Sequence, residues 1–212
     1  MSLEDVAEAG FAPVAASIAA GRIPGAVLGV LDAEGRVAVR VGGAAQLEPG
    51  RAPASRATIY DLASLTKPLF TTTAILRLVE QGRIALDDPL ARAIPDLRQY
   101  DMNAAERRLT FRQCLAHATF LPAVEPLYTL GLDPATLRAH VLQREWRQGP
   151  CVYSDINFIL LGIALERLSG RPLAEHDPGP GLSFRPDPAL CAAQQSTTAR
   201  SPSCGRSASV IE

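Results

Sequence analysis

A single β-hairpin followed by a long run of helical segments is the feature that most restricts how this chain can fold. Residues 26–43 read as AVLGVLD and VAVRVGG around a tight turn at Glu34 and Gly35, which is typical of two antiparallel strands. Helical patterns then fill residues 58–170. Because no strand alternates with these helices, the order predicts an α+β fold and not an alternating βαβ fold.

Capping residues mark the ends of the expected helices. Residues 3–20 form a first helix, which Gly21 ends. In the later region the expected helices are one that starts near Ser64 and stops at Gly82, residues 110–118 after Thr110, residues 134–143 after Asp133, and residues 155–169 before Gly170. The last of these is strongly apolar. In the helix that starts near Ser64, the residues spaced to face a core are Leu69, Ile75, Leu78 and Val79.

The composition is that of an ordinary soluble globular protein. Of 212 residues, 47% are apolar and 20% are charged, and the formal net charge is −1. This length allows one sizeable core or two small ones. A near-neutral chain has no basic surface with which to neutralise phosphates, so we expect no nucleic-acid partner.

Two features bear on location. No apolar run approaches the ~18–20 residues that a membrane-spanning helix needs. The N-terminal stretch MSLEDVAEAG carries Glu4, Asp5 and Glu8 and lacks the basic and apolar regions of a secretory signal. The sequence therefore predicts a cytoplasmic protein with no membrane span; a periplasmic protein is the alternative if the true N-terminus precedes Met1.

The cysteines give no sign of a metal or redox site. Cys114, Cys151, Cys191 and Cys204 form no CxxC pair, and no histidine stands at metal-ligand spacing from them. We therefore expect free, partly buried thiols, no metal ion and no cofactor.

The chain changes character after residue 176. Residues 177–212 are rich in Pro, Ser, Ala and Arg and have no periodic apolar pattern. Such a segment buries too little apolar surface to offset the entropy of ordering it. We expect residues 1–176 to hold the folded domain and residues 177–212 to form a disordered tail.

Ser64 and Lys67 stand three positions apart in SLTK, at the head of an expected helix. A serine hydroxyl becomes a nucleophile when a neighbouring base takes its proton, and residues i and i+3 of a helix share one face. A lysine serves as that base only if its pKa is lowered. The apolar neighbours expected to lower it by desolvation are Leu62, Leu65, Leu69 and Phe70.

Ser-x-x-Lys alone is common in chains of this length and needs supporting context. Pro68 biases Lys67 away from helical geometry, so the proline is tolerated only if the helix begins close to Ser64. The spacing is therefore compatible with catalysis but does not establish it.

Three blocks of sequence supply that context. In chain order they are GRIPGAVLGVLDAEGRVAVRVGGAAQ, TIYDLASLTKPLFTTTAILRLVEQGRIALDDPLARAIP and CVYSDINFILLGIALERLSGRPL. Together they resemble the serine β-lactamase and penicillin-binding-protein superfamily, in particular its class C-like β-lactamases, family VIII-type esterases and D-aminopeptidases. The resemblance covers about residues 11–176. It implies a β-lactamase/transpeptidase-like fold, with an N-terminal helix and hairpin and a helical domain.

The resemblance implies roles for four residues. Ser64 is expected to be acylated by an ester, a β-lactam or a D-amino-acid amide, and Lys67 and Tyr153 to share the proton transfer. Asp155 replaces the asparagine of the family's Tyr-x-Asn motif and is expected to contact substrate. Because a carboxylate near Lys67 raises the lysine pKa, we expect Tyr153 to carry more of the base role.

The histidines are not expected to complete a catalytic triad. His117, His140 and His176 are interpreted as surface or capping residues. His117 begins HATFLP, which stands where the family has His-Thr-Ser-Gly-Leu, with Phe120 in place of the glycine. We interpret this segment as a structural loop.

The family's third motif, Lys/His-Thr-Gly or a variant, has no counterpart here. The C-terminal sheet strands are therefore expected to be missing, through a frameshift or a truncated gene model after about residue 190. Losing one oxyanion donor costs about 10²–10³ in rate, so little activity is expected. Two alternatives stay open: an incompetent fragment or binding protein of the same fold, and an unrelated helical module with a chance Ser-x-x-Lys.

Overall fold

Residues 1–176 are the part of the chain that the computed structural model describes. They fall into two units, Met1–Asp61 and a second unit that begins at Leu62. The expected disordered tail, residues 177–212, lies outside the described residues.

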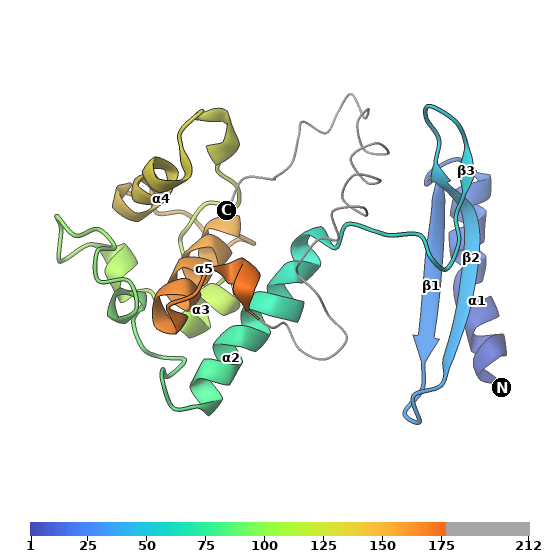
Figure 1. Ribbon diagram of the computed structural model, residues 1–212, viewed down its shortest axis with the longest axis horizontal. Coiled ribbons are helices and arrows are strands. Elements are labelled where there is room, and N and C mark those ends of the chain that lie inside the picture. Colours follow the sequence, from blue (N-terminus) through green and yellow to red (C-terminus); the bar gives the residue numbers. More distant parts are fainter. Residues whose placement is uncertain (177–212) are drawn as a thin grey trace. The chain divides into compact units, whose positions relative to one another are not determined.

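The first unit packs one helix along a small antiparallel sheet (Figure 1). α1 (Leu3–Ala19) begins with a capping box at Ser2. β1 (Gly25–Leu31) and β2 (Val37–Gln46) form the hairpin that the sequence predicted, with Leu31 opposite Val37. The short β3 (Ala52–Pro53) pairs with the end of β2, so the strand order is β1-β2-β3.

Small residues let α1 approach the hairpin closely. Phe11 of α1 is buried, and a Cβ at Gly42 would lie only 3.0 Å from its ring. At the end of the hairpin, Gly43 has a φ of +77°, and a Cβ there would lie 2.3 Å from the Pro24 carbonyl oxygen. Glycine is therefore required at position 43, whereas a side chain at position 42 would have to push the Phe11 ring aside.

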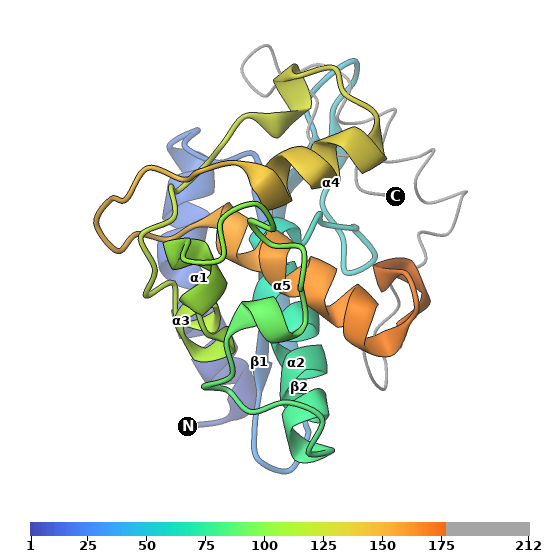
Figure 2. The same ribbon diagram turned by 90° about the vertical axis from the view of Figure 1, so that its left-hand side faces the viewer.

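The second unit is helical. It contains α2 (Thr73–Glu80), α3 (Phe111–Leu115), α4 (Pro134–Gln143) and α5 (Asp155–Ser169), joined by loops and short 3-10 turns. Figure 2 shows α5 crossing this unit, and both α2 and α3 contact it. Within residues 1–176, every helix is too short or too polar to cross a bilayer.

The core of the helical unit is built around α5. The apolar DINFILLGIALERLS stretch supplies buried residues on nearly every side, as its composition predicts for a central helix. The largest fully buried apolar side chains of this core are Ile75, Leu90, Ile94, Leu97, Phe111, Leu121, Val141, Ile156, Leu160, Leu161 and Leu165. They fix the start of α5, where Asp155 lies.

The expected helix ends are confirmed for three helices. Thr110 caps α3 in a reciprocal capping box with Gln113. Asp133 accepts backbone N–H groups at the start of α4. α5 ends at Gly170, which has a left-handed φ of +70°.

The segment that leads into α2 departs from the regular helix that the sequence predicted. Ala63–Leu65 forms a 3-10 turn, Lys67–Thr72 forms a π-helical turn, and the α-helix begins only at Thr73. Pro68 explains this interruption, because it has no N–H to donate and disfavours the α conformation of the residue before it.

The π-helical turn also changes which side chains face the core. Leu69, expected to be inside, is 40% exposed, whereas Phe70 is 4% exposed. A π turn widens the helix and rotates the following residues relative to an α-helix. Ile75 and Leu78, beyond the turn, are buried as expected.

Candidate active site

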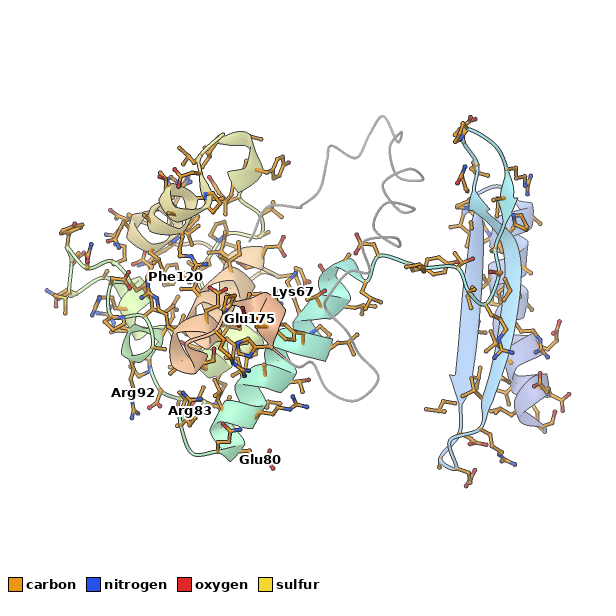
Figure 3. The ribbon with its side chains drawn as sticks, viewed as in Figure 1. Lys67, Glu80, Arg83, Arg92, Phe120 and Glu175 are labelled. Atoms are coloured by element: carbon orange, nitrogen blue, oxygen red, sulfur yellow. The ribbon has the colours of Figure 1, made fainter. Side chains whose placement is uncertain are left out.

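Ser64 and Lys67 meet at the start of the helical unit. Ser64 lies in the 3-10 turn, and Lys67 is the first residue of the π-helical turn that follows. Lys67 donates a hydrogen bond from Nζ to Ser64 Oγ at 3.1 Å. Ala63, directly before the serine, has a left-handed φ of +43°, a conformation that costs energy for a non-glycine residue and is enriched at functional sites. The π-helical turn that begins with Lys67 contacts α5, and Figure 3 labels Lys67.

Tyr153 joins this pair from the loop before α5. The Lys67 Nζ atom lies 5.0 Å from the centroid of the Tyr153 ring. Hydrogen bonds of the Tyr153 phenol with Ser64 and then with Lys67 lower the pKa of Tyr153 below its usual value. The three residues expected to be catalytic are therefore brought together by the fold.

Asp155, the first residue of α5, lies beside the lysine. Its Oδ1 is 2.8 Å from Lys67 Nζ. Burial lowers the pKa of Lys67, but its hydrogen bonds to Asp155 and Tyr153 outweigh burial, and the pKa is raised above its usual value. This is the direction expected from an aspartate in the family's asparagine position. Lys67 is thus an ammonium at neutral pH and a poor base.

The side chains that shield Lys67 are not those that the sequence suggested. Leu62, Leu65 and Leu69 are 46%, 56% and 40% exposed, so the expectation that they desolvate the lysine was wrong. The Phe158 ring, 5.7 Å from Lys67 Nζ, lies over it instead. With Tyr153 and Asp155, this ring leaves the lysine side chain 15% exposed.

His117 belongs to the same cluster, although the sequence predicted a surface or capping residue. Its ring centroid lies 4.3 Å from that of Tyr153, with 34° between the planes. Its Nδ1 accepts the Ser154 N–H at 3.0 Å. The signal that would have found it is its place in HATFLP, a segment that matched a family motif.

The loop that follows His117 holds the start of α5. Ser154 Oγ donates to the Pro122 carbonyl oxygen at 2.6 Å, and the Asp155 N–H donates to the Ala123 carbonyl oxygen at 2.9 Å. Together with the bond to His117, these contacts tie the residues next to Tyr153 to residues 117–123. The expectation that HATFLP is a structural loop is consistent with this arrangement.

A buried hydrogen bond anchors the same loop to α5. Thr119 Oγ1 donates to Asn157 Oδ1 at 2.8 Å and accepts the Leu121 N–H at 3.2 Å. Thr119 and Asn157 are 3% and 0% exposed. If the threonine hydroxyl is removed, Asn157 Oδ1 and the Leu121 N–H each lose a hydrogen bond. Water cannot readily replace these bonds, because the site is buried.

Replacing Thr119 with valine is expected to lower the free energy of unfolding of the helical unit by about 1–3 kcal/mol, because two buried polar groups lose their partner. The measurement is urea unfolding followed by fluorescence of Trp146, the one tryptophan in the chain. Thr129→Val, at an exposed turn, is the control and should change it by less than about 0.5 kcal/mol. Equal effects of the two variants would contradict the role of the buried contact.

Two cavities open beside the candidate nucleophile. One of about 490 Å³ is lined by Ser64, Lys67 and Asp155 and continues between α4 and α5 along mainly apolar side chains. The other, of about 460 Å³, is lined by residues that include Ser64, Lys67, His117 and Tyr153. Both are large enough for a small acyl compound, and both reach the Ser64 hydroxyl.

The described cysteines and acidic residues form no metal site. Among residues 1–176, no group of three or more His, Cys, Asp or Glu side chains lies close enough to hold a metal ion. Cys114 is buried, which raises the pKa of its thiol to about 12, and Cys151 is exposed. Both are free thiols, and neither contributes to the contacts around Ser64.

Ser64, Lys67 and Tyr153 thus lie together, in the order along the chain that the family resemblance implied. The family model described as Beta-lactamase matches residues 11–176. The chain therefore belongs to the β-lactamase family of serine hydrolases, as its three blocks of sequence indicated.

Similar proteins include one named as an esterase and one named as a putative carboxypeptidase. The chain is 32% identical to esterase EstB of Burkholderia gladioli over 64% of its own length and 38% of that protein. It is 30% identical to a putative D-alanyl-D-alanine carboxypeptidase of Escherichia coli (strain K12) over 57% of its length and 30% of that protein. The chain thus spans between 30% and 38% of the length of these relatives.

Solved structures agree on the fold. A β-lactamase from Sulfitobacter sp. EE-36 matches with a TM-score of 0.64 and 28% identity, over 81% of this chain and 45% of that one. A class C β-lactamase from Rhodobacter sphaeroides matches with a TM-score of 0.62 and 29% identity, over 79% of this chain and 45% of that one. The expected β-lactamase/transpeptidase-like α+β fold is confirmed.

Proposed function

We propose that this chain is a serine hydrolase that forms an acyl-enzyme on Ser64 with an ester, a β-lactam or a D-amino-acid amide. The observation that carries the proposal is the convergence on Lys67, whose Nζ is 3.1 Å from Ser64 Oγ and 2.8 Å from Asp155 Oδ1, beside Tyr153. This arrangement joins a nucleophile to a proton acceptor and a fixed positive charge.

The roles that we propose for Lys67 and Tyr153 follow from the directions in which their pKa values are shifted. Lys67, with a raised pKa, stays an ammonium, and Tyr153, with a lowered pKa, is the group that reaches its anionic form more easily. The Tyr153 phenolate takes the proton of Ser64 as Oγ bonds to the carbonyl carbon. The phenol then returns that proton to the leaving oxygen or nitrogen as the carbonyl–heteroatom bond breaks. Water releases the acyl group from Ser64 by the same route.

The relatives support the choice of substrate class. One is named as an esterase and another as a putative D-alanyl-D-alanine carboxypeptidase, and both names denote reactions at an acyl carbon. The cavities beside Ser64 favour a small molecule over a macromolecular partner.

Covalent labelling tests the proposal. The chain is incubated with a fluorophosphonate, and separately with a fluorescent penicillin, and the modified peptide is identified by mass spectrometry. We expect one label per chain with the fluorophosphonate, carried by Ser64. No labelling of a sample whose Trp146 fluorescence shows a cooperative unfolding transition would contradict the proposal and favour a non-catalytic binding protein of this fold.

Asp155→Asn is expected to move the pH dependence of acylation. The Asp155 charge raises the pKa of both Lys67 and Tyr153, so its removal lowers the pKa of Tyr153 further and supplies more phenolate at a given pH. The rising limb of the rate should shift to lower pH, with a rate about 2- to 10-fold higher near pH 7. Glu145→Gln, an exposed carboxylate elsewhere, is the control. A profile that Asp155→Asn leaves unchanged would count against the phenolate base.

A further inference from the structure

The contacts of His117 exceed what a structural loop requires. The backbone of His117 has a left-handed φ of +53°, an uncommon conformation for a residue other than glycine. This conformation follows the end of α3 and is accompanied by a hydrogen bond from the His117 N–H to the Cys114 carbonyl oxygen at 3.2 Å. The ring then lies against the residues that begin α5.

The His117 ring is stacked among aromatic neighbours. Its centroid is 4.3 Å from the Tyr153 ring and 5.1 Å from the Phe158 ring, with interplanar angles of 34° and 39°. Lys67 Nζ lies over both of these partner rings, at 5.0 Å and 5.7 Å. Tyr153 is 53% exposed, so few groups hold its ring in place. The described groups that contact the ring are the His117 imidazole and the Lys67 ammonium.

The hydrogen bonds of His117 fix its protonation state. Nδ1 accepts the Ser154 N–H at 3.0 Å, and the Asn157 Nδ2 lies 3.4 Å from the same atom. The Asn157 Oδ1 accepts the Thr119 hydroxyl, which orients its amide nitrogen toward the histidine. A nitrogen that faces two donors must be unprotonated, so the ring proton lies on Nε2.

The charged surroundings of His117 also favour the neutral ring. Burial lowers the pKa of His117, and the Lys67 ammonium lowers it further, whereas the Asp155 carboxylate acts in the opposite direction. The other titratable neighbours are Tyr153, against its face, and Cys114, whose thiol is kept protonated by a pKa of about 12. The imidazole therefore stays neutral to a lower pH than an exposed histidine.

We propose that His117 is a positioning residue for Tyr153: its neutral imidazole holds the Ser154 N–H on Nδ1 and the Tyr153 ring against its face, and so sets the phenol oxygen beside Ser64 and Lys67. The proposal rests on the proposed function of Tyr153 as the proton carrier. His117 itself exchanges no proton with substrate.

Protonation of His117 would undo this arrangement. A proton on Nδ1 turns the acceptor into a donor, which then faces the Ser154 N–H and loses that bond. The positioning is therefore complete above the pKa of His117 and is lost as the pH falls through it. Because the phenol must lie within hydrogen-bond reach of Ser64, a displacement of about 1 Å is expected to slow acylation by up to about 10²-fold.

NMR of the full chain tests the positioning without any reaction. Nitrogen-15 shifts of the His117 ring should show an unprotonated Nδ1 and a protonated Nε2 at neutral pH. The Tyr153 ring protons should lose their ring-current displacement in His117→Ala, but not in His140→Ala. A proton on Nδ1, or Tyr153 resonances that His117→Ala leaves unchanged, would overturn the proposal.

Rates of Ser64 labelling by the fluorophosphonate test the consequence. His117→Ala should lower the rate constant about 10- to 100-fold. His117→Asn, whose Oδ1 can accept the Ser154 N–H, should stay within about tenfold of the original chain. The original chain should show the limb of Tyr153 and a further loss of reactivity at low pH that parallels the NMR titration of His117. His117→Asn should keep the limb of Tyr153 and lack the further loss. His140→Asn is the matched control.

The outcomes separate this proposal from the one on which it rests. If the original chain is not labelled, the proposed function fails, and the positioning of Tyr153 is still decided by the NMR measurements. If the original chain is labelled and His117→Ala is labelled equally fast, the proposed function holds and the role of His117 is overturned. Trp146 fluorescence during unfolding shows whether each variant is folded.

Discussion

Ser64→Ala is expected to abolish covalent labelling by a fluorophosphonate, with a loss of more than about 10³-fold in the labelling rate constant. The reason is chemical: the alanine has no oxygen to attack phosphorus or a carbonyl carbon, and the remaining groups cannot replace it. The rate of label incorporation under excess reagent, measured by mass spectrometry of the intact chain, gives the result directly.

The fold should survive this substitution, because Ser64 is exposed at the surface of a 3-10 turn. The unfolding midpoint from Trp146 fluorescence should therefore match that of the original chain. Ser55→Ala, an exposed serine of the first unit, is the matched control and should be labelled at the original rate. Undiminished labelling of Ser64→Ala would place the nucleophile elsewhere and reject the site.

Tyr153→Phe is expected to lower the rate of Ser64 acylation about 10²–10⁴-fold, the range usual for loss of a general acid–base group. The phenylalanine keeps the ring between His117 and the Lys67 ammonium and removes only the oxygen that hydrogen bonds with Ser64 and Lys67. The loss should therefore appear in the rate constant for acylation, measured by single-turnover labelling, and not in stability.

Two comparisons make this result specific. Tyr128→Phe removes the hydroxyl of a tyrosine that is 70% exposed in a separate turn, and it should leave the rate unchanged. The pH dependence should also lose its rising limb in Tyr153→Phe, since the group that titrates is gone. A variant that keeps both the rate and the limb would transfer the base role to Lys67.

The features that were predicted correctly depend on residues close together in the sequence or on the resemblance to the family. The end of α1, the hairpin, the start of α3 and the limits of α4 and α5 follow from caps and apolar spacing that act within a few residues. The end of α3 does not, since this helix stops at Leu115 and was expected to reach residue 118. Tyr153 and Asp155 were placed beside Ser64 by resemblance, since no spacing rule connects residues so far apart. The raised pKa of Lys67 followed once Asp155 stood in that place.

The helix at Ser64 was predicted less well because two local rules conflicted there. The apolar spacing indicated one continuous helix, whereas Pro68 opposed it, and the chain adopts a 3-10 turn and a π turn in sequence. A change in residues per turn shifts every later side chain around the axis. Leu69 consequently turned outward, and spacing alone could not reveal it.

His117 was misjudged for a different reason. A lone histidine carries no periodic signal, and its role depends on a left-handed backbone conformation and on a ring that reaches it from a distant part of the chain. Both are products of tertiary packing. The segment HATFLP departs from the family motif at Phe120, and this departure bears on the backbone of the turn and not on the role of His117.

The ion pair between Lys67 and Asp155 has a consequence for the charge of a preferred substrate. With Tyr153 in its phenolate form, the ammonium and the two anions sum to one negative charge, whereas an asparagine at position 155 would leave the cluster neutral. A substrate that brings its own carboxylate close to Lys67 meets a cation already paired at 2.8 Å. On the proposed function, we therefore expect the cluster to disfavour acidic acyl donors relative to uncharged esters.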